Sequence, residues 1–217
     1  MKIKNLSFII FLIPTLTVIF SYIFSLNLNL VPSCIPIIDG CTSISRAGRY
    51  FPVNIFFKTL MFISGVAILL YWYGNYKFFI SLSYNKFIKV TYILGLCSIF
   101  FLFLYLIFLG ENNYYKFFRK IGIFIYILFS IISEFLLSLN YFINIKNKLL
   151  RNSFVKYKLI LSTFLIILGV FLFPLMVMKI DNVSNLRNII SWNYFLLIQG
   201  NFLFTYLAWK KKGLSKF

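Results

Sequence analysis

The sequence contains no histidine and only four acidic residues, Asp39, Glu111, Glu134 and Asp181. Without histidine, a chain cannot build a serine–histidine triad or a histidine-ligated metal or haem site. Nor does it contain the motifs GxxxxGK[ST], GxGxxG, HExxH, CxxC or GxSxG. Most hydrolytic and metal-dependent chemistry is therefore excluded, and we expect no catalytic residue, no metal and no cofactor.

Charged residues of either sign are also scarce. They make up 12% of the 217 residues, whereas hydrophobic side chains make up 61%. A soluble domain carries about a quarter charged residues and at most about half apolar ones. One water-soluble core cannot bury so much apolar surface, so we predict that the chain folds in a lipid bilayer as a single membrane domain.

The charges that are present are nearly all positive, and the formal net charge is +18. The 22 Lys and Arg residues lie in short clusters between apolar runs. This pattern is typical of segments that orient membrane helices and attract anionic lipid headgroups. Binding of nucleic acid would require a basic face on a solvent-exposed domain, so we expect no nucleic-acid partner.

Six apolar runs are each long enough to cross a bilayer as a helix of about 20 residues. They cover residues 6–26, 53–73, 87–109, 121–143, 157–178 and 189–209. The first run is longer than the roughly 7–15 residues of a signal-peptide core and lacks a small-x-small cleavage site, so we expect a retained helix. The predicted fold class is all-α, a polytopic integral membrane protein with six transmembrane helices.

Basic residues predict the orientation, because cytoplasmic loops are enriched in Lys and Arg. With the N-terminus inside, fourteen basic residues are cytoplasmic and eight lie on the opposite side. The cytoplasmic set includes Lys156 and Lys158, at the start of the fifth run. We therefore predict that both termini are cytoplasmic and that residues 27–52 form an outer loop.

The outer loop carries two cysteines, Cys34 and Cys41, separated by six residues. On an oxidising side of the membrane they could form a disulfide, which would stabilise the fold by about 2–3 kcal/mol in the chain-entropy model. Two free thiols are the alternative. Cys97 lies within the third run, where we expect a small packing residue.

The same loop carries a candidate site for lipid headgroups. Arg46 and Arg49 are three residues apart, so a helical turn would place both on one face. Their guanidinium groups suit bidentate contacts with phosphate. Lys58 follows near the start of the second run, and Asp39 is a candidate internal partner for these cations. The alternative is that the long side chains snorkel to the membrane interface.

Glu134 lies close to the middle of the fourth run, where a charge is costly and usually functional. Ser130 and Ser133 fall on or near the same helical face. In the sixth run, Gln199 and Asn201 are expected near the bilayer midplane. Two interpretations are open: a site facing a water-filled or headgroup-lined cavity, or an interhelical hydrogen-bond clamp worth about 0.6 kcal/mol.

Parts of the outer loop resemble a superfamily of six-helix membrane proteins. The segments that carry the resemblance are PIIDG (36–40), TSIS (42–45) and RYFP (49–52). They are similar to the damage-regulated autophagy modulator (DRAM) and FGF-receptor-activating-protein families and to the post-GPI-attachment proteins. The resemblance implies cytoplasmic termini and a non-catalytic role in lipid handling, GPI-anchor maturation or membrane organisation. That superfamily has an acidic residue in its final helix, whereas Glu134 lies in the fourth run.

Together, these features predict a non-enzymatic membrane protein that binds or organises lipids, with anionic headgroups as its partners. The alternative is a small-solute or proton-coupled permease that uses Glu134. An intramembrane enzyme acting on lipids is the least favoured hypothesis, because no acid–base pair is evident. Short loops and residues with AT-rich codons favour a bacterial inner membrane, and the resemblance fits a eukaryotic Golgi, ER or lysosomal membrane equally.

Overall fold

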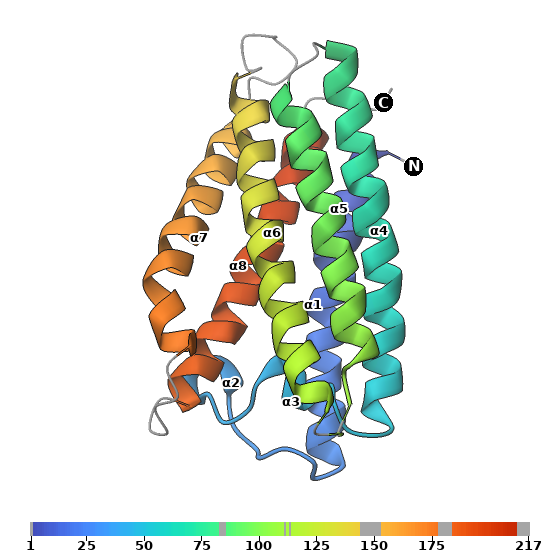
Figure 1. The fold of residues 1–217 in the computed structure, drawn as a ribbon, viewed down its shortest axis with the longest axis vertical. Coiled ribbons are helices and arrows are strands. Elements are labelled where there is room, and N and C mark those ends of the chain that lie inside the picture. Colours follow the sequence, from blue (N-terminus) through green and yellow to red (C-terminus); the bar gives the residue numbers. More distant parts are fainter. Residues whose placement is uncertain are drawn as a thin grey trace.

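A computed structural model of the chain describes residues 2–82, 86–110, 112, 114–143, 153–177 and 184–211. In these ranges the chain is built from helices and the turns between them, and it contains no strand. The long helices are α1 (Ile3–Asn27), α4 (Val53–Leu82), α5 (Lys86–Ile107), α6 (Tyr115–Ile143), α7 (Ser153–Val177) and α8 (Ser184–Lys211) (Figure 1). Two short helices, α2 (Pro36–Asp39) and α3 (Ile44–Ala47), lie between α1 and α4. Glu111 and Asp181 are outside the described residues.

Five helices in the described part of the chain are long and apolar enough to cross a membrane, namely α1, α4, α5, α6 and α7. Their outward faces carry large apolar side chains, such as Phe171 at 74% exposure. Such a surface is unfavourable in water and indicates a helical membrane protein, as the composition predicts. α8 has 28 residues, which is long enough to cross, but it is more polar than the other five. The count of six spans therefore stays a prediction.

Two helices extend well beyond the apolar runs that predict them. α4 continues from the expected end at residue 73 to Leu82, and α6 begins at Tyr115 instead of residue 121. These extensions contain polar residues that are buried against neighbouring helices, including Asn75 and Arg119. Hydropathy marks only the apolar part of a helix, whereas backbone hydrogen bonding and packing continue past it.

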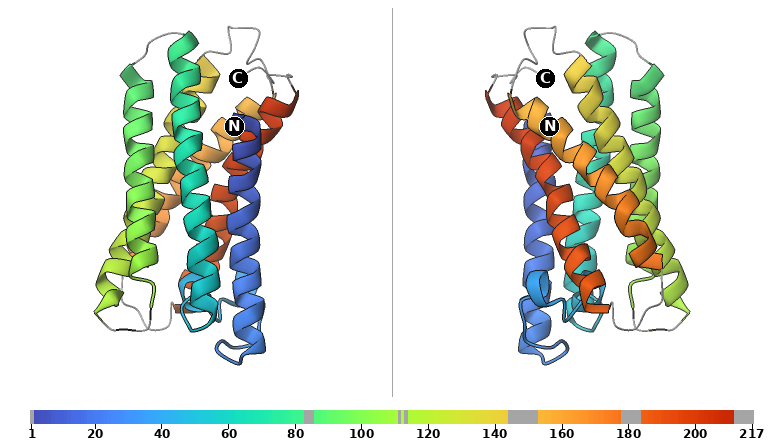
Figure 2. Two further views of the ribbon diagram at one scale, coloured as in Figure 1. Left: turned by 90° about the vertical axis from the view of Figure 1, so that its right-hand side faces the viewer. Right: turned by 90° about the vertical axis from the view of Figure 1, so that its left-hand side faces the viewer.

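The six long helices form a closed ring. α1 packs on α4, α4 on α5, α5 on α6, α6 on α7, α7 on α8, and α8 returns to α1. Neighbours run in opposite directions, so α1 begins and α8 ends at the same end of the bundle (Figures 1 and 2). We call this the terminal end. The opposite end, which carries α2 and α3, is the loop end.

Candidate functional site

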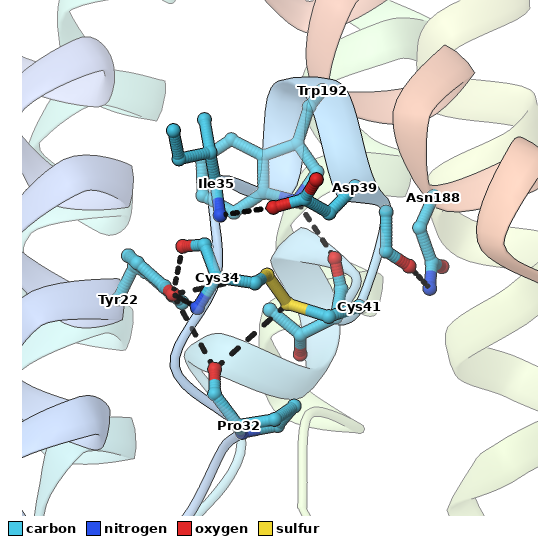
Figure 3. Close-up of a disulfide and its surroundings, with 10 residues drawn as sticks. Tyr22, Pro32, Cys34, Ile35, Asp39, Cys41, Asn188 and Trp192 are labelled. Atoms are coloured by element: carbon cyan, nitrogen blue, oxygen red, sulfur yellow. Dashed lines mark hydrogen bonds between the residues drawn. A yellow bond between two sulfur atoms is a disulfide. The ribbon is translucent and has the colours of Figure 1, made fainter.

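Residues 28–52 form a cap on the loop end, and a disulfide lies within it. Cys34 and Cys41 are bridged, with Cα atoms 6.4 Å apart (Figure 3). The bond predicted from the sequence is therefore present, and Cys97 is the free cysteine. The hydroxyl group of Tyr22 on α1 accepts from the N–H of Cys34 at 3.1 Å and donates to its carbonyl at 2.6 Å. This pair of bonds holds the start of the bridged segment against α1.

The cap is also tied to α8. The side-chain amide of Asn188 donates to the carbonyl of Gly40 at 2.7 Å, and the indole of Trp192 donates to the carbonyl of Thr42 at 2.9 Å (Figure 3). Gly40 has a φ of +64°, and a Cβ at this position would lie 2.1 Å from the carbonyl oxygen of Asn185. Glycine is thus required both by the backbone conformation and by the close approach of α8.

The structure places the four headgroup candidates at separate positions. Asp39 accepts from the N–H of Ile35 at 2.7 Å, which closes the turn of α2. Within the described residues, it forms no salt bridge with an arginine. Arg46 is exposed on α3, which ends before Arg49. Arg49 is half-buried, and its Nε has no hydrogen-bond partner. Lys58 is half-buried on α4.

A second arginine lies close to Arg49 at the loop end. Arg119, at the start of α6, is buried and donates to the carbonyl of Gly110 at 2.9 Å. Both guanidinium groups are near enough to the hydroxyl of Tyr105 to interact with it electrostatically. That hydroxyl is hydrogen-bonded to Ser45 of the cap at 2.8 Å. The cap therefore rests on α5 beside two positive charges.

A partly open cavity of about 670 Å³ lies between the helices of the ring, and the cap borders it at the loop end. Along α8 its lining runs from Ser184 to Gln199, which corresponds to roughly 22 Å at 1.5 Å per residue. The walls between are apolar and include Phe57, Met61, Ile68, Leu102, Ile127 and Phe195. Among the described side chains, α1, α4, α5, α6 and α8 contribute to the lining, and α7 does not.

The two ends of this cavity are polar in different ways. At the loop end, the lining contains two cations, Lys120 and Arg187, together with hydroxyl and amide groups of the cap and α8. At the inner end, Gln199 of α8 and Ser64 of α4 line the space and are buried at 2% and 1% exposure. Gln199 is one of the residues predicted from its depth in the membrane. Ser64 could not be found in this way, because a serine within an apolar run is ordinary in membrane helices.

Glu134 does not face lipid and forms a buried ion pair. Its carboxylate accepts from the ammonium group of Lys158 on α7, and the two side chains are 2% and 1% exposed. The same ammonium donates to the hydroxyl of Thr205 at 2.7 Å and to the carbonyl of Asn201 at 3.4 Å, both on α8. The three donors of one lysine therefore connect α6, α7 and α8.

The position of Lys158 corrects one sequence-based assignment. The orientation count placed it among the cytoplasmic residues, but it is buried in the candidate span of α7. Removing it changes that count from fourteen against eight to thirteen against eight, which favours the same orientation. Glu134 lies five residues past the midpoint of α6 and nine residues before Ile143, where the helix ends at the terminal end of the bundle.

A second set of hydrogen bonds crosses the ring interior at the terminal end. The hydroxyl groups of Tyr71 and Thr205 lie 3.3 Å apart. Tyr141 donates to the side-chain carbonyl of Asn75 at 2.5 Å and accepts from the indole of Trp209 at 2.9 Å. These bonds join α4, α6 and α8 across the terminal half of the ring.

The remaining predicted residues differ in their surroundings. Ser133 is buried and donates to the carbonyl of Phe129 at 2.6 Å, so its hydroxyl is satisfied within α6. Ser130 is buried beside Tyr126, which lines the cavity and is close enough to Glu134 for an electrostatic interaction. Of the predicted intramembrane residues, Glu134 and Asn201 are brought together by Lys158, which donates to the carboxylate of the first and to the backbone carbonyl of the second.

Comparison of the chain with protein-family models, with curated proteins and with solved structures finds no match. A functional assignment must therefore rest on the geometry of the cavity, the cap and the ion pair.

Proposed function

We propose that this protein binds an amphiphile with an anionic headgroup inside its helix ring. The observation that carries the proposal is the cavity of about 670 Å³, with apolar walls and with Lys120 and Arg187 at the loop end. Small-molecule sites commonly have volumes of about 300–1,000 Å³. Neither described acidic residue, Asp39 or Glu134, lines the cavity. A hydrocarbon chain would contact the walls, and a phosphate or carboxylate would meet the cations.

The proposed topology has six spans, with α8 as the sixth and with both termini in the cytoplasm. The antiparallel ring supports it, because the start of α1 and the end of α8 lie at the same end. The excess of basic residues favours that end as cytoplasmic. The disulfide lies in the cap at the opposite end, as expected for an oxidising side.

Cysteine labelling tests this topology in a Cys97→Ala background. Tyr114→Cys places a thiol at an exposed position at the loop end, and Ser153→Cys places one at the terminal end. A membrane-impermeant maleimide should label the first in intact cells or sealed vesicles, and the second only after permeabilisation. The reverse pattern would overturn the orientation.

The role that we propose is non-enzymatic lipid handling or membrane organisation. The similarity of segments 36–40, 42–45 and 49–52 to the six-helix DRAM-type superfamily supports it, as do the apolar walls of the cavity. The partners that we propose are membrane lipids with anionic headgroups. A bacterial inner membrane is the favoured location, and a eukaryotic endomembrane is the alternative.

Ligand binding can be tested by native mass spectrometry of the purified protein titrated with a long-chain alkyl phosphate. Ile127 lines the cavity, whereas its neighbour Leu128 is 44% exposed on the outer surface. Ile127→Trp should lower the affinity by about tenfold or more, equivalent to about 1.4 kcal/mol, because the indole occupies the cavity. Leu128→Trp is the matched control and should bind as the wild type does. Equal binding by all three proteins would contradict the proposal.

The buried ion pair favours a second candidate function, a small-solute or proton-coupled carrier. Ionisable residues within membrane segments often mark ion or substrate pathways, and Glu134 with Lys158 is such a pair. A flux assay in proteoliposomes would compare the wild type with Glu134→Gln. Equal flux for the two proteins would remove Glu134 from any transport mechanism.

A further inference from the structure

Two arginines from different parts of the chain lie close together at the loop end. Arg49 follows α3 in the cap, and Arg119 lies near the start of α6. Their guanidinium groups are close enough to repel each other, and both interact electrostatically with the hydroxyl of Tyr105. That hydroxyl is fixed by its hydrogen bond to Ser45 of the cap at 2.8 Å. Two like charges are therefore held next to each other, one on the cap and one on α6.

The packing of α6 against α5 fixes the position of Arg119. A Cβ at Gly122 would lie 3.0 Å from the backbone nitrogen of Tyr105, so the two helices approach closely here. Arg119 is three residues earlier and lies on the same helical face as Gly122. It is 8% exposed, and one of its terminal amino groups donates to the carbonyl of Gly110 at 2.9 Å. The guanidinium group is therefore held in place by the fold.

Neither guanidinium group is saturated by the protein. An arginine carries five N–H donors. Within the described residues, Arg119 forms one side-chain hydrogen bond, to Gly110, and the side chain of Arg49 forms none. The Nε of Arg49 is enclosed by protein, whereas its two terminal amino groups and the second terminal amino group of Arg119 are unpaired and not enclosed. These amino groups are available to a ligand.

Among the described residues, no carboxylate compensates this pair of charges. Asp39 accepts from the N–H of Ile35 within its own turn, and Glu134 pairs with Lys158 nearer the terminal end. Adjacent cations without a counter-ion repel each other, and a bound anion removes that cost. Guanidinium groups suit phosphate in particular, because two of their N–H donors can face two oxygens at once.

We propose that Arg49 and Arg119 form a binding site for a phosphate group at the loop end. The site is separate from the cavity, because neither arginine lines it, and it does not depend on a cavity ligand. Large exposed side chains flank both arginines in sequence, with Phe51 at 70% and Phe117 at 65% exposure. Aromatic side chains are typical of the membrane interface, where the phosphates of lipid headgroups lie beside those dissolved in water. A phosphate bound by both arginines also joins the cap to α6.

The first test measures the binding of inorganic phosphate to the purified protein by equilibrium dialysis. The ionic strength is held constant, because salt screens exposed charges. Arg49→Gln and Arg119→Gln should each weaken binding by about tenfold or more, through the loss of charge-assisted hydrogen bonds. If Arg119→Gln does not fold, the half-buried Arg49 decides the question. Lys116→Gln is the matched control, since it removes an exposed cation from the same end of α6 and should bind within about twofold of the wild type.

The second test replaces the ion by a lipid, dioctanoyl phosphatidic acid, and measures its retention by native mass spectrometry. It uses the Ile127→Trp background, so that the cavity does not contribute. Adding Arg49→Gln should again weaken binding by about tenfold or more. Dioctanoylglycerol has the same chains without the phosphate, and its binding should not change with Arg49→Gln. Arginine-dependent binding of the inorganic ion shows a site for free phosphate, and such binding of the lipid alone shows a site for a headgroup.

Three outcomes would overturn the inference. The first is that neither probe binds to a protein that retains both arginines. The second is that both probes bind equally well with and without the two arginines. The third is that phosphate binds only after Glu111→Gln, which would show that a carboxylate of the chain neutralises the pair. None of these results bears on the cavity, whose occupation is tested separately with the alkyl phosphate and Ile127→Trp.

Discussion

Lys158 of α7 pairs with Glu134 of α6 inside the bundle, and the same ammonium group also reaches α8 through Thr205. Three helices therefore depend on one charged group that is shielded from water. Taking two charges out of water is costly, and the cost is repaid only while both partners are present. This arrangement makes the pair sensitive to the loss of either partner alone.

Lys158→Met and Glu134→Leu should each lower the free energy of unfolding by about 3–5 kcal/mol, because one buried charge is left uncompensated. The double variant should recover most of this loss, because neither charge remains. Reversible unfolding in mixed detergent micelles measures the three values. A double variant that is as unstable as the sum of the single ones would show that the residues act independently.

Tyr141→Phe should lower the free energy of unfolding by about 1–3 kcal/mol, because it leaves the buried groups of Asn75 and Trp209 without their shared partner. Tyr157→Phe is the control, since Tyr157 is 52% exposed on the outer surface. It should change the stability by less than about 0.5 kcal/mol. Equal effects in the two variants would contradict a structural role for the hydroxyl of Tyr141.

Gly40→Ala should detach the cap from α8, because the added Cβ would collide with the backbone of Asn185 and the residue has a positive φ. We expect a loss of about 3 kcal/mol or more and faster tryptic cleavage at Arg46 in the cap. Gly74→Ala in α4 is the control, since its nearest neighbour atom would be 3.2 Å away on the side chain of Ile3. That variant should be neutral or slightly stabilised, and release of the cap in both variants would contradict this interpretation.

The chain unfolded in denaturant should take up one maleimide before reduction and three after it, because Cys34 and Cys41 are bridged and Cys97 is free. Cys97→Ala should reduce these numbers to zero and two. Reduction should also lower the stability of the folded protein by about 2–3 kcal/mol through the greater entropy of the unfolded chain. Three adducts without reductant would show that the bridge does not form.

The sequence predicts those features that depend on local composition. The five most apolar runs lie in helices because a chain in lipid must satisfy its backbone hydrogen bonds internally. Cys34 and Cys41 are close enough in sequence for their pairing to be foreseen. Glu134 is conspicuous because a carboxylate in an apolar run is rare, and its burial follows from the cost of exposing it to lipid.

Features that depend on how the helices face one another could not be predicted. Lys158 opens an apolar run, and in sequence this pattern is the same as that of a lysine anchored at the membrane surface. Its pairing with Glu134 is set by the rotation of α6 and α7 about their axes. The cavity also escapes prediction, because its volume depends on how far apart the helices lie, and Ser64 acquires significance only where α4 borders that space.

α8 contacts the cap, lines the cavity and binds the lysine of the buried ion pair. Near its start, Asn188 and Trp192 bind the cap; Gln199 lines the inner end of the cavity; and Thr205 contacts Lys158. From Asn188 to Thr205 the helix rises roughly 25 Å. A continuous helix moves largely as one body, so a ligand that displaces α8 will alter the contacts at both ends of the bundle together. The cap at the loop end and the ion pair nearer the terminal end are therefore mechanically coupled through one helix.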